Sequence, residues 1–120
     1  MGELIPAQLD TVFHALGDAT RRQMLRDLSE GERTVGELAR PFDMSLAAAS
    51  KHVKALEGAG LLRREIRGRT HYCRLDSRPL SGAFDWLAYY ERLWSNRFDE
   101  LERLLREEAA SNIPPSGEDQ

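Results

Sequence analysis

Basic residues gather in one segment of the chain, from Met44 to Arg78. This segment has eight lysines and arginines against three carboxylates, so its net charge is +5, whereas the rest of the chain carries −8. Side chains of this type and density contact DNA phosphates or, alternatively, form an ordinary solvated surface. A basic patch on an acidic body would allow a DNA-binding protein to have a total charge of −3.

Residues typical of catalytic and metal chemistry are few. The chain has one cysteine, Cys73, and three histidines, His14, His52 and His71, and no two of the histidines have the spacing of local metal ligands. His71 and Cys73 would share one face of a strand, but two ligands do not make a site. No phosphate-binding glycine loop and no Ser/His/Asp constellation is evident. The sequence therefore predicts neither an enzyme nor a metal or other cofactor, and it assigns no catalytic residue.

The single cysteine also bears on the compartment. It excludes an intrachain disulfide framework and fits a reducing cytoplasm. A redox switch at Cys73 would need a reactive thiolate and a resolving partner, so a small strand residue is the favoured interpretation. No apolar run approaches the roughly 20 residues that cross a bilayer, and the first ten residues lack the pattern of a secretion signal. We therefore expect a cytoplasmic protein without a membrane partner.

Helical periodicity and capping residues predict the elements that position the basic side chains. We expect one helix with its apolar face at positions 9, 12, 13 and 16, a second from Ala19 to about Ser29, a third after the Thr34–Glu37 capping box, and a fourth from Leu46 to about Ala59. Between Leu61 and Leu75 the pattern predicts two short strands with a turn at Gly68. A long last helix then runs from Pro79 to about Ala110.

This order of elements is typical of a winged helix-turn-helix. The expected fold class is mainly α with a small β-hairpin wing and a long C-terminal dimerisation helix. The fourth helix would enter the major groove of DNA, and the hairpin would reach the neighbouring backbone or minor groove. We expect a single domain over 1–110 and a disordered tail over 111–120, which is rich in proline, glycine and polar residues.

The fourth helix divides into faces. Leu46, Ala49, Val53 and Leu56 lie on one face, which is expected to pack on the core. The candidate DNA-contacting residues on the opposite face and at the hairpin tip are Ala47, Ala48, Lys51, Lys54, Arg67 and Arg69, and Ser50 and His52 lie at the two edges of that face. Small side chains permit close approach to bases, and the basic ones reach base edges, phosphates or the minor groove. Plain helix propensity and a solubilising surface are the alternatives.

Four motifs carry a family resemblance: FHALGDATRRQML, TVGELA, SLAAASKHVKALEGAGLL and REIRGRTHYCRL. In this order and spacing they resemble the arsenical-resistance-repressor (ArsR-type) winged-helix transcription factors, over roughly residues 9–76. The resemblance implies a homodimeric, cytoplasmic repressor of a near-palindromic operator, whose affinity an inducer usually lowers. The Ser-x-His pattern of that family matches Ser50 and His52, which are therefore expected to contact DNA.

Two departures from the family bear on metal sensing. Many relatives have a Cys-x-Cys at the positions of Thr34 and Gly36, and neither residue is a metal ligand. Other relatives bind zinc with Asp and His on the last helix, but no histidine follows His71. The resemblance therefore implies a branch without the metal-binding cysteines, and we expect no response to metals. Whether an unknown inducer exists is left open.

The last helix carries a broad apolar stripe at heptad spacing, interrupted at Glu91. A chain of this size has too little core to bury it, so we expect the last and first helices to pair across a two-fold axis. The residues assigned to this homodimer interface are Leu9, Phe13, Phe84, Leu87, Trp94, Phe98 and Leu101. An inducer pocket among Trp86, Tyr89, Tyr90 and Trp94 is weighed against ordinary core packing.

The function predicted from sequence is therefore a homodimeric, sequence-specific transcriptional repressor that binds double-stranded DNA and does not respond to metals. A winged-helix protein–protein interaction module that uses the same surface is the alternative, because fold does not fix function. The +5 segment favours DNA.

Overall fold

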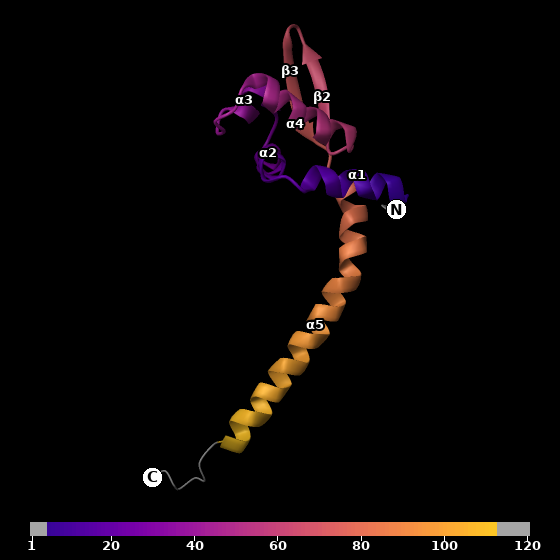
Figure 1. The fold of residues 1–120 in the computed structure, drawn as a ribbon, viewed down its shortest axis with the longest axis vertical. Helices are drawn as coiled ribbons and strands as arrows, with labels where there is room; N and C mark the ends of the chain where they lie inside the picture. Colours follow the sequence, from indigo (N-terminus) through magenta and orange to yellow (C-terminus); the bar gives the residue numbers. More distant parts are fainter. Residues whose placement is uncertain (1–4, 113–120) are drawn as a thin grey trace. The chain divides into compact units, whose positions relative to one another are not determined.

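The computed structural model describes residues 5–112 and shows the expected helices and β-hairpin (Figure 1), together with one short additional strand. They are α1 (Pro6–Leu16), α2 (Ala19–Ser29), β1 (Arg33–Thr34), α3 (Val35–Ala39), α4 (Leu46–Gly58), β2 (Leu62–Arg67), β3 (Thr70–Leu75) and α5 (Arg78–Asn112). The chain divides into two compact units, Met1–Asp85 and Trp86–Gln120. We call residues 5–85 the winged body and residues 86–112 the distal helix. The prediction of a mainly α fold with a β-hairpin wing is confirmed.

Side-chain caps set the starts of α2 and α3. An Asp18 Oδ1 accepts a hydrogen bond from the backbone N–H of Arg21 at 3.1 Å, at the start of α2. At α3, Thr34 Oγ1 accepts from the N–H of Glu37 at 3.1 Å, while the Glu37 carboxylate accepts from the N–H of Thr34 at 2.8 Å. These bonds satisfy N–H groups that have no partner within the helix. They also lower the pKa values of the Asp18 and Glu37 carboxyls.

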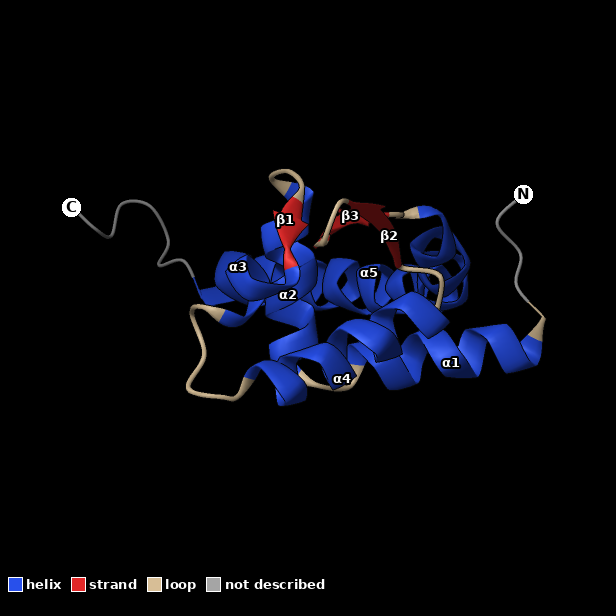
Figure 2. Cartoon of the chain, turned by 90° about the horizontal axis from the view of Figure 1, so that it is seen from above, coloured by secondary structure: helices blue, strands red, loops and turns tan. Residues whose placement is uncertain are grey.

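The three strands form one antiparallel sheet in the order β1-β3-β2 (Figure 2). The hairpin register pairs Arg67 with Thr70 across a turn in which Gly68 has a φ of +64°, a conformation that favours glycine. The sequence pattern did not predict β1. It is two residues long and pairs Arg33 with Cys73, so it has no alternation of its own to detect. The β2–β3 hairpin projects beyond the helices of the winged body (Figure 1).

The core of the winged body combines residues from all five helices and the sheet. Its largest fully buried side chains are Met24, Leu38, Leu56, Leu61, Leu62, Val12, Val53 and Cys73. Met24, Leu25 and Leu28 are all buried and form the inward face of α2. Because α4 contributes Ala49, Val53 and Leu56 to this core, its opposite face is held toward solvent.

Three sequence-based expectations need correction or completion. Leu46 was assigned to the buried face of α4, but it is 60% exposed, because the first turn of the helix extends past the core. The last helix starts at Arg78 rather than Pro79, and it continues to Asn112. Positions 111 and 112 of the predicted tail are thus helical, and 113–120 lie outside the described residues. None of the described helices combines the length and hydropathy of a membrane span.

Candidate nucleic-acid interface

Helix α4 presents the candidate recognition surface. Ser45 adopts an extended conformation at the N-cap, and its Oγ accepts from the N–H of Ala48 at 3.1 Å. The helix ends at Gly58, and Gly60 follows with a φ of +76°, a left-handed conformation in which a glycine terminates the helix. The two ends of α4 are fixed by these caps, and its buried face is fixed by the core. The core therefore determines which residues of α4 face outward.

That outward face is small and basic. Ala47, Lys51 and Lys54 are exposed, and Ala48 is half-buried. Within residues 5–112 neither lysine forms a hydrogen bond or an ion pair. Their ammonium groups are therefore available to an anionic partner, and the alanines would let that partner come close to the helix backbone.

His52 lies at the edge of this face, and its ring is near side chains at the start of α2. Its side chain is 21% exposed, and its Nδ1 lies 3.3 Å from Nη1 of Arg21 and 3.8 Å from Oδ1 of Asp18. Arg21 also donates from Nε to the carbonyl oxygen of Ala15 at 2.7 Å and from Nη2 to that of His14 at 3.0 Å. The recognition-helix histidine is thus joined to the junction between α1 and α2.

The two arginines at the wing tip differ in their partners. The Arg67 guanidinium donates to the carboxylates of Glu32 and Glu65 and stacks on the Tyr72 ring, 4.3 Å from its centroid. Both ion pairs raise the pKa of Arg67 above its ordinary value. Arg69 forms no hydrogen bond or ion pair with any other described residue. Arg69 is therefore the uncompensated charge of the tip.

Glu32 joins the wing to the turn before β1. Besides Arg67, its carboxylate accepts from Nε of Arg74 at 3.0 Å. Arg74 and then Arg67 are the main reasons that the pKa of the Glu32 carboxyl lies below its usual range. Of the basic wing side chains, Arg67 and Arg74 are thus used within the molecule.

A third wing arginine ties the hairpin to α4. Arg64 is only 16% exposed, donates from Nη2 to Glu57 at 3.0 Å, and lies 3.2 Å from Nδ1 of His71 through Nη1. This bridge joins the end of α4, β2 and β3. It fixes the wing relative to the recognition helix without adding a free charge.

Residues of α4 and the wing meet at a groove of about 420 Å³. Its walls also include the start of α3. The lining residues are Thr34, Val35, Gly36, Leu46, Ser50, Arg64, Arg69, Thr70 and His71. The groove therefore brings Ser50 and Arg69, two of the predicted contact residues, to one surface. The exposed Leu46 is part of the same surface.

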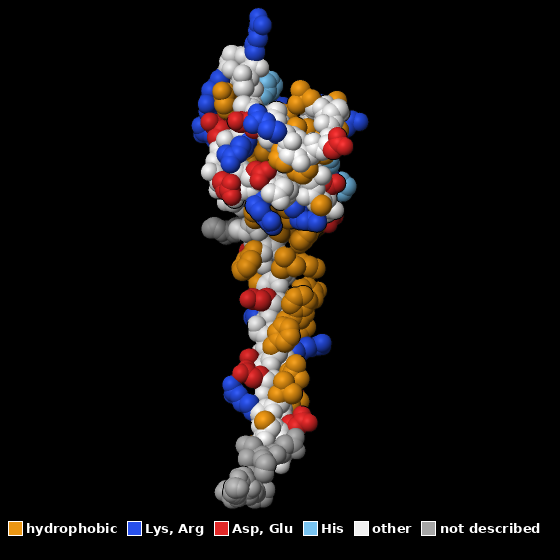
Figure 3. All heavy atoms as spheres, turned by 90° about the vertical axis from the view of Figure 1, so that its left-hand side faces the viewer, with side chains coloured by type: hydrophobic (Ala, Val, Ile, Leu, Met, Phe, Trp, Pro, Cys, Tyr) orange, Lys and Arg blue, Asp and Glu red, His pale blue; other side chains and the backbone are white. Residues whose placement is uncertain are grey.

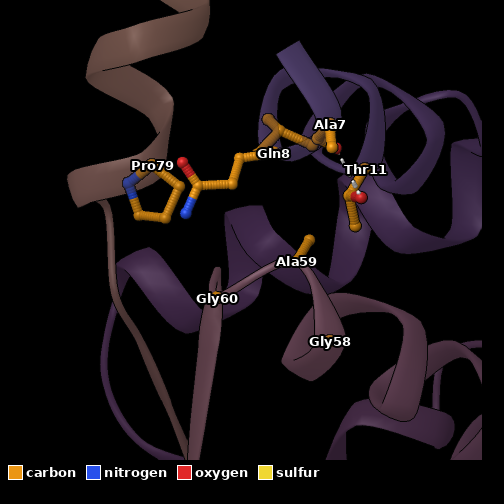
Figure 4. A pocket seen from close by; sticks show the side chains of 8 residues that line it. Ala7, Gln8, Thr11, Gly58, Ala59, Gly60 and Pro79 are labelled. Atoms are coloured by element: carbon orange, nitrogen blue, oxygen red, sulfur yellow. Dashed lines mark hydrogen bonds between the residues drawn. The ribbon is translucent and has the colours of Figure 1, made fainter. Parts of the chain in front are cut away.

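A second cavity, of about 350 Å³, lies between α1, the end of α4 and the first turn of α5 (Figure 4). Small residues form much of its wall, and the side chains of Gln8 and Thr11 are the polar groups that line it. The Thr11 hydroxyl donates to the carbonyl oxygen of Ala7 at 2.9 Å. No charged residue lines this cavity.

Metal-ligating and redox-active residues of the described part of the chain bear on metal sensing and on a redox switch. No group of three His, Cys, Asp or Glu side chains within residues 5–112 has a geometry that could hold a metal ion. Cys73 is fully buried in the core, and burial raises the pKa of its thiol. A buried thiol with a raised pKa is a poor nucleophile, which agrees with a packing role.

The distal helix has a different character from the winged body. Its apolar side chains form an exposed stripe along one face of α5 (Figure 3). Of the predicted dimer residues, Trp94 is 62% and Phe98 65% exposed. The exposed apolar residues of the distal helix are Trp86, Leu87, Tyr89, Tyr90, Leu93, Trp94, Phe98, Leu101, Leu104 and Leu105. Two ion pairs at i, i+4 spacing, Arg103–Glu107 and Arg106–Glu102, follow the polar side.

The remaining predicted interface residues lie in the winged body. Phe84 is 64% exposed, whereas Leu9 and Phe13 of α1 are partly buried against the core. In the distal helix, the rings of Trp86 and Tyr90 are 5.0 Å apart and those of Tyr89 and Tyr90 are 5.1 Å apart. These rings contact one another along one helix face, as core or interface aromatics do.

Sequence reasoning missed the residues that support the interface. Arg21 and Glu32 were not singled out, although they hold His52 and Arg67. Their partners are 31 and 35 residues away in sequence. No local pattern indicates contacts of that separation.

Comparison with known proteins agrees with this geometry. Residues 16–65 match the family model described as a helix-turn-helix domain. The transcriptional repressor SdpR of Bacillus subtilis is 30% identical over 66% of this chain and 88% of its own. A crystal structure of an ArsR family transcriptional regulator superposes with a TM-score of 0.71 and 42% identity, over 78% of this chain and 96% of that one.

A homodimeric winged helix-turn-helix DNA-binding domain from Mycobacterium bovis, solved in solution, is also similar. It has a TM-score of 0.57 and 32% identity, over 72% of this chain and 82% of its own. These relatives are transcriptional regulators rather than enzymes. Fold, recognition surface and relatives together place the chain in the ArsR family of winged helix-turn-helix, DNA-binding transcriptional regulators.

Proposed function

We propose that the protein is a homodimeric repressor that binds a near-palindromic operator, with α4 in the major groove and the wing on the flanking backbone. The observation that carries this proposal is the outward face of α4. It combines small side chains with Lys51 and Lys54, which have no partner among the described residues, and it adjoins a wing tip with the uncompensated Arg69. The small alanine side chains leave room for bases to approach the helix, and alanine can contact a thymine methyl group.

The homodimer is supported by the exposed stripe of the distal helix. Contiguous apolar surface of this extent on a regulator marks an interface. The similar domain from Mycobacterium bovis is described as homodimeric. We assign Phe84, Leu87, Trp94, Phe98 and Leu101 of α5 to the interface, together with Leu9 and Phe13 of α1. Two copies related by a two-fold axis would present two α4 helices to two half-sites.

The direction of regulation is supported by a relative's name, since SdpR is described as a transcriptional repressor. The regulatory signal is a separate question. Thr34 is the N-cap of α3 and Gly36 lies within that helix, at the positions where many relatives have metal-sensing cysteines, and neither residue supplies a metal ligand. We therefore propose that metals do not alter operator affinity. If an inducer exists, it acts by another chemistry.

The function is tested by selecting duplexes from a randomised pool with the purified protein, followed by titrations over a salt series. We expect a two-fold symmetric site and an affinity that falls steeply with salt, because phosphate contacts release counterions. Absence of any selected sequence, together with weak binding to all duplexes, would favour the protein-interaction module instead.

Metal response is tested with the same selected duplex. Titrations with zinc, cadmium or arsenite are compared with a chelated control, and we expect equal affinities. A tenfold change that persists in Cys73→Ser would contradict the proposal. A change that disappears in that variant would instead point to the thiol.

A further inference from the structure

We infer that Arg21 is a positioning residue for DNA recognition: it holds the His52 imidazole in one orientation and one tautomer, and it ties that orientation to the last turn of α1. The inference rests on the proposed function, because it assigns His52 a contact with DNA. It adds a residue of α2 that lies outside the recognition helix and the wing.

The chemistry of the contact defines the tautomer. A guanidinium has only donors, so the 3.3 Å contact between Arg21 Nη1 and His52 Nδ1 is a hydrogen bond only when Nδ1 accepts. The neutral ring then carries its proton on Nε2. No hydrogen bond from Nε2 is found among the described residues, so this N–H remains for a phosphate or base acceptor. Asp18 Oδ1, at 3.8 Å from Nδ1, caps α2 through the N–H of Arg21.

The guanidinium is itself fixed by α1. Its Nε and Nη2 donate to the carbonyl oxygens of Ala15 and His14, at 2.7 and 3.0 Å, which leaves Nη1 for the ring. Three donors of one planar group therefore join α1 to α4 in a defined geometry. A flexible side chain at position 21 would satisfy one partner at a time and would leave the ring free to rotate. DNA binding would then have to order it.

The chain provides a matched control in the next residue. Arg22 also caps α1, through a 2.7 Å hydrogen bond from Nη1 to the carbonyl oxygen of Leu16, but it does not contact His52. Arg22→Gln thus removes a helix cap of the same kind without touching the imidazole. Arg21→Lys keeps a positive charge near the carbonyls but cannot bridge to the ring, so it remains informative if Arg21→Gln folds poorly.

The test combines affinity and ring spectroscopy in the full chain. We expect Arg21→Gln and Arg21→Lys to weaken binding to the selected duplex by about three- to tenfold, through the ordering of one side chain. Arg22→Gln should bind like wild type. In a His52→Ala background the Arg21 substitutions should have no further effect, because the ring they position is gone.

The ¹⁵N signals of His52 in the free protein give a readout that does not involve DNA. We expect an unprotonated Nδ1 and a protonated Nε2 in wild type and in Arg22→Gln, and a mixture of tautomers in Arg21→Lys. A proton on Nδ1 in wild type, or equal losses of affinity in Arg21→Lys with and without His52, would overturn the inference. Failure of the wild-type protein to bind DNA at all would instead contradict the proposed function and leave the ring result to decide the contact.

Discussion

The winged body and the distal helix differ in the burial of their apolar side chains. In the winged body, Leu56, Val53 and Met24 are fully buried, whereas in the distal helix Trp94 and Phe98 are more than 60% exposed. The hydrophobic effect acts equally on both sets. The body therefore satisfies its apolar residues within one chain, and the helix carries apolar surface that one chain does not cover.

The same contrast distinguishes stabilisation by contacts within one chain from stabilisation by contacts with a second copy. The helices of the body are held by caps and by a shared core. An isolated helix in water gains little from propensity and two surface ion pairs, so most of its stability must come from packing. We therefore expect the distal helix to depend on a second copy and the body to depend chiefly on itself.

The largest expected effect comes from breaking the apolar stripe. Trp94→Glu places a charge in the proposed interface, which should give a monomer or an aggregate. Loss of the linked second half-site should lower operator affinity by about 10²–10⁴-fold. Sedimentation and duplex titration measure the two effects.

Ser95→Glu is the matched control for that substitution. It adds the same side chain at the neighbouring exposed position of α5. We expect it to remain dimeric and to bind the duplex. Wild-type protein that sediments as a monomer at micromolar concentration would contradict the assignment of the stripe to a homodimer.

A second prediction tests whether the two units are stabilised separately, with the tryptophans as probes of one unit and the cysteine as probe of the other. Both tryptophans, Trp86 and Trp94, lie in the distal helix, and the single cysteine, Cys73, is buried in the body. Leu56→Ala leaves a cavity in the core and should cost about 2–5 kcal/mol of the free energy of unfolding. The urea midpoint should fall, and alkylation of Cys73 under native conditions should become faster.

The same truncation in the other unit provides the comparison. Leu104 is 47% exposed, so Leu104→Ala should leave Cys73 protected and change mainly the concentration dependence of tryptophan fluorescence. Equal loss of Cys73 protection in both variants would show that the two units do not stabilise themselves separately.

Local interactions explain how much of the fold was predictable. Asp18, Thr34 and Ser45 cap helices through contacts three residues away, so the starts of α2, α3 and α4 followed from sequence. The turn at Gly68 was predictable for the same reason, since a positive φ favours glycine. The outward positions of Ala47, Lys51 and Lys54 on α4 followed from helical periodicity, whereas the candidate roles of Ser50 and His52 rest on the family resemblance.

Features that depend on distant partners were not predictable. Strand β1 exists because Arg33 pairs with Cys73, and the partners of His52 and Arg67 are likewise separated by more than 30 residues. The exposure of Leu46 depends on where the core ends rather than on its place in the apolar pattern. Sequence thus indicated which residues face outward, but not which of the outward charges are already paired.

A third prediction compares one positive charge in each unit. Lys51→Ala removes a charge from the centre of the outward face of α4, where side chains reach base edges. It should cost about 1–3 kcal/mol on the selected duplex and relax the preference at one base step per half-site.

Arg97→Ala removes an equal charge from the distal helix, where Arg97 is exposed and has no ion pair with another described residue. It should change affinity little at moderate salt, because Arg97 is not part of the proposed contact surface and salt screens exposed charges. If Lys51→Ala weakens the selected and scrambled duplexes equally, Lys51 contacts phosphate and does not recognise a base.

The smallest expected effect distinguishes the two arginines that flank Gly68. Arg69 is uncompensated, so Arg69→Ala should remove one phosphate contact per wing and make the slope of log affinity against log salt shallower by about one per wing, or about two per dimer. Arg67 is held by Glu32 and Glu65, so Arg67→Ala should leave that slope nearly unchanged. Both variants are titrated on selected and scrambled duplexes across a salt series. A selective loss on duplexes with A·T-rich flanks would instead place Arg69 in a narrow minor groove, where it senses DNA shape.

In the Trp94→Glu monomer, the change in salt slope caused by Arg69→Ala should be half as large as in the dimer, because only one wing then contacts DNA. The effect of Arg69→Ala on the salt slope would thus report how many wings contact DNA, and hence whether the distal helix holds two copies together. An equal effect of Arg69→Ala in the monomer and in the dimer would contradict this connection between the distal helix and DNA binding.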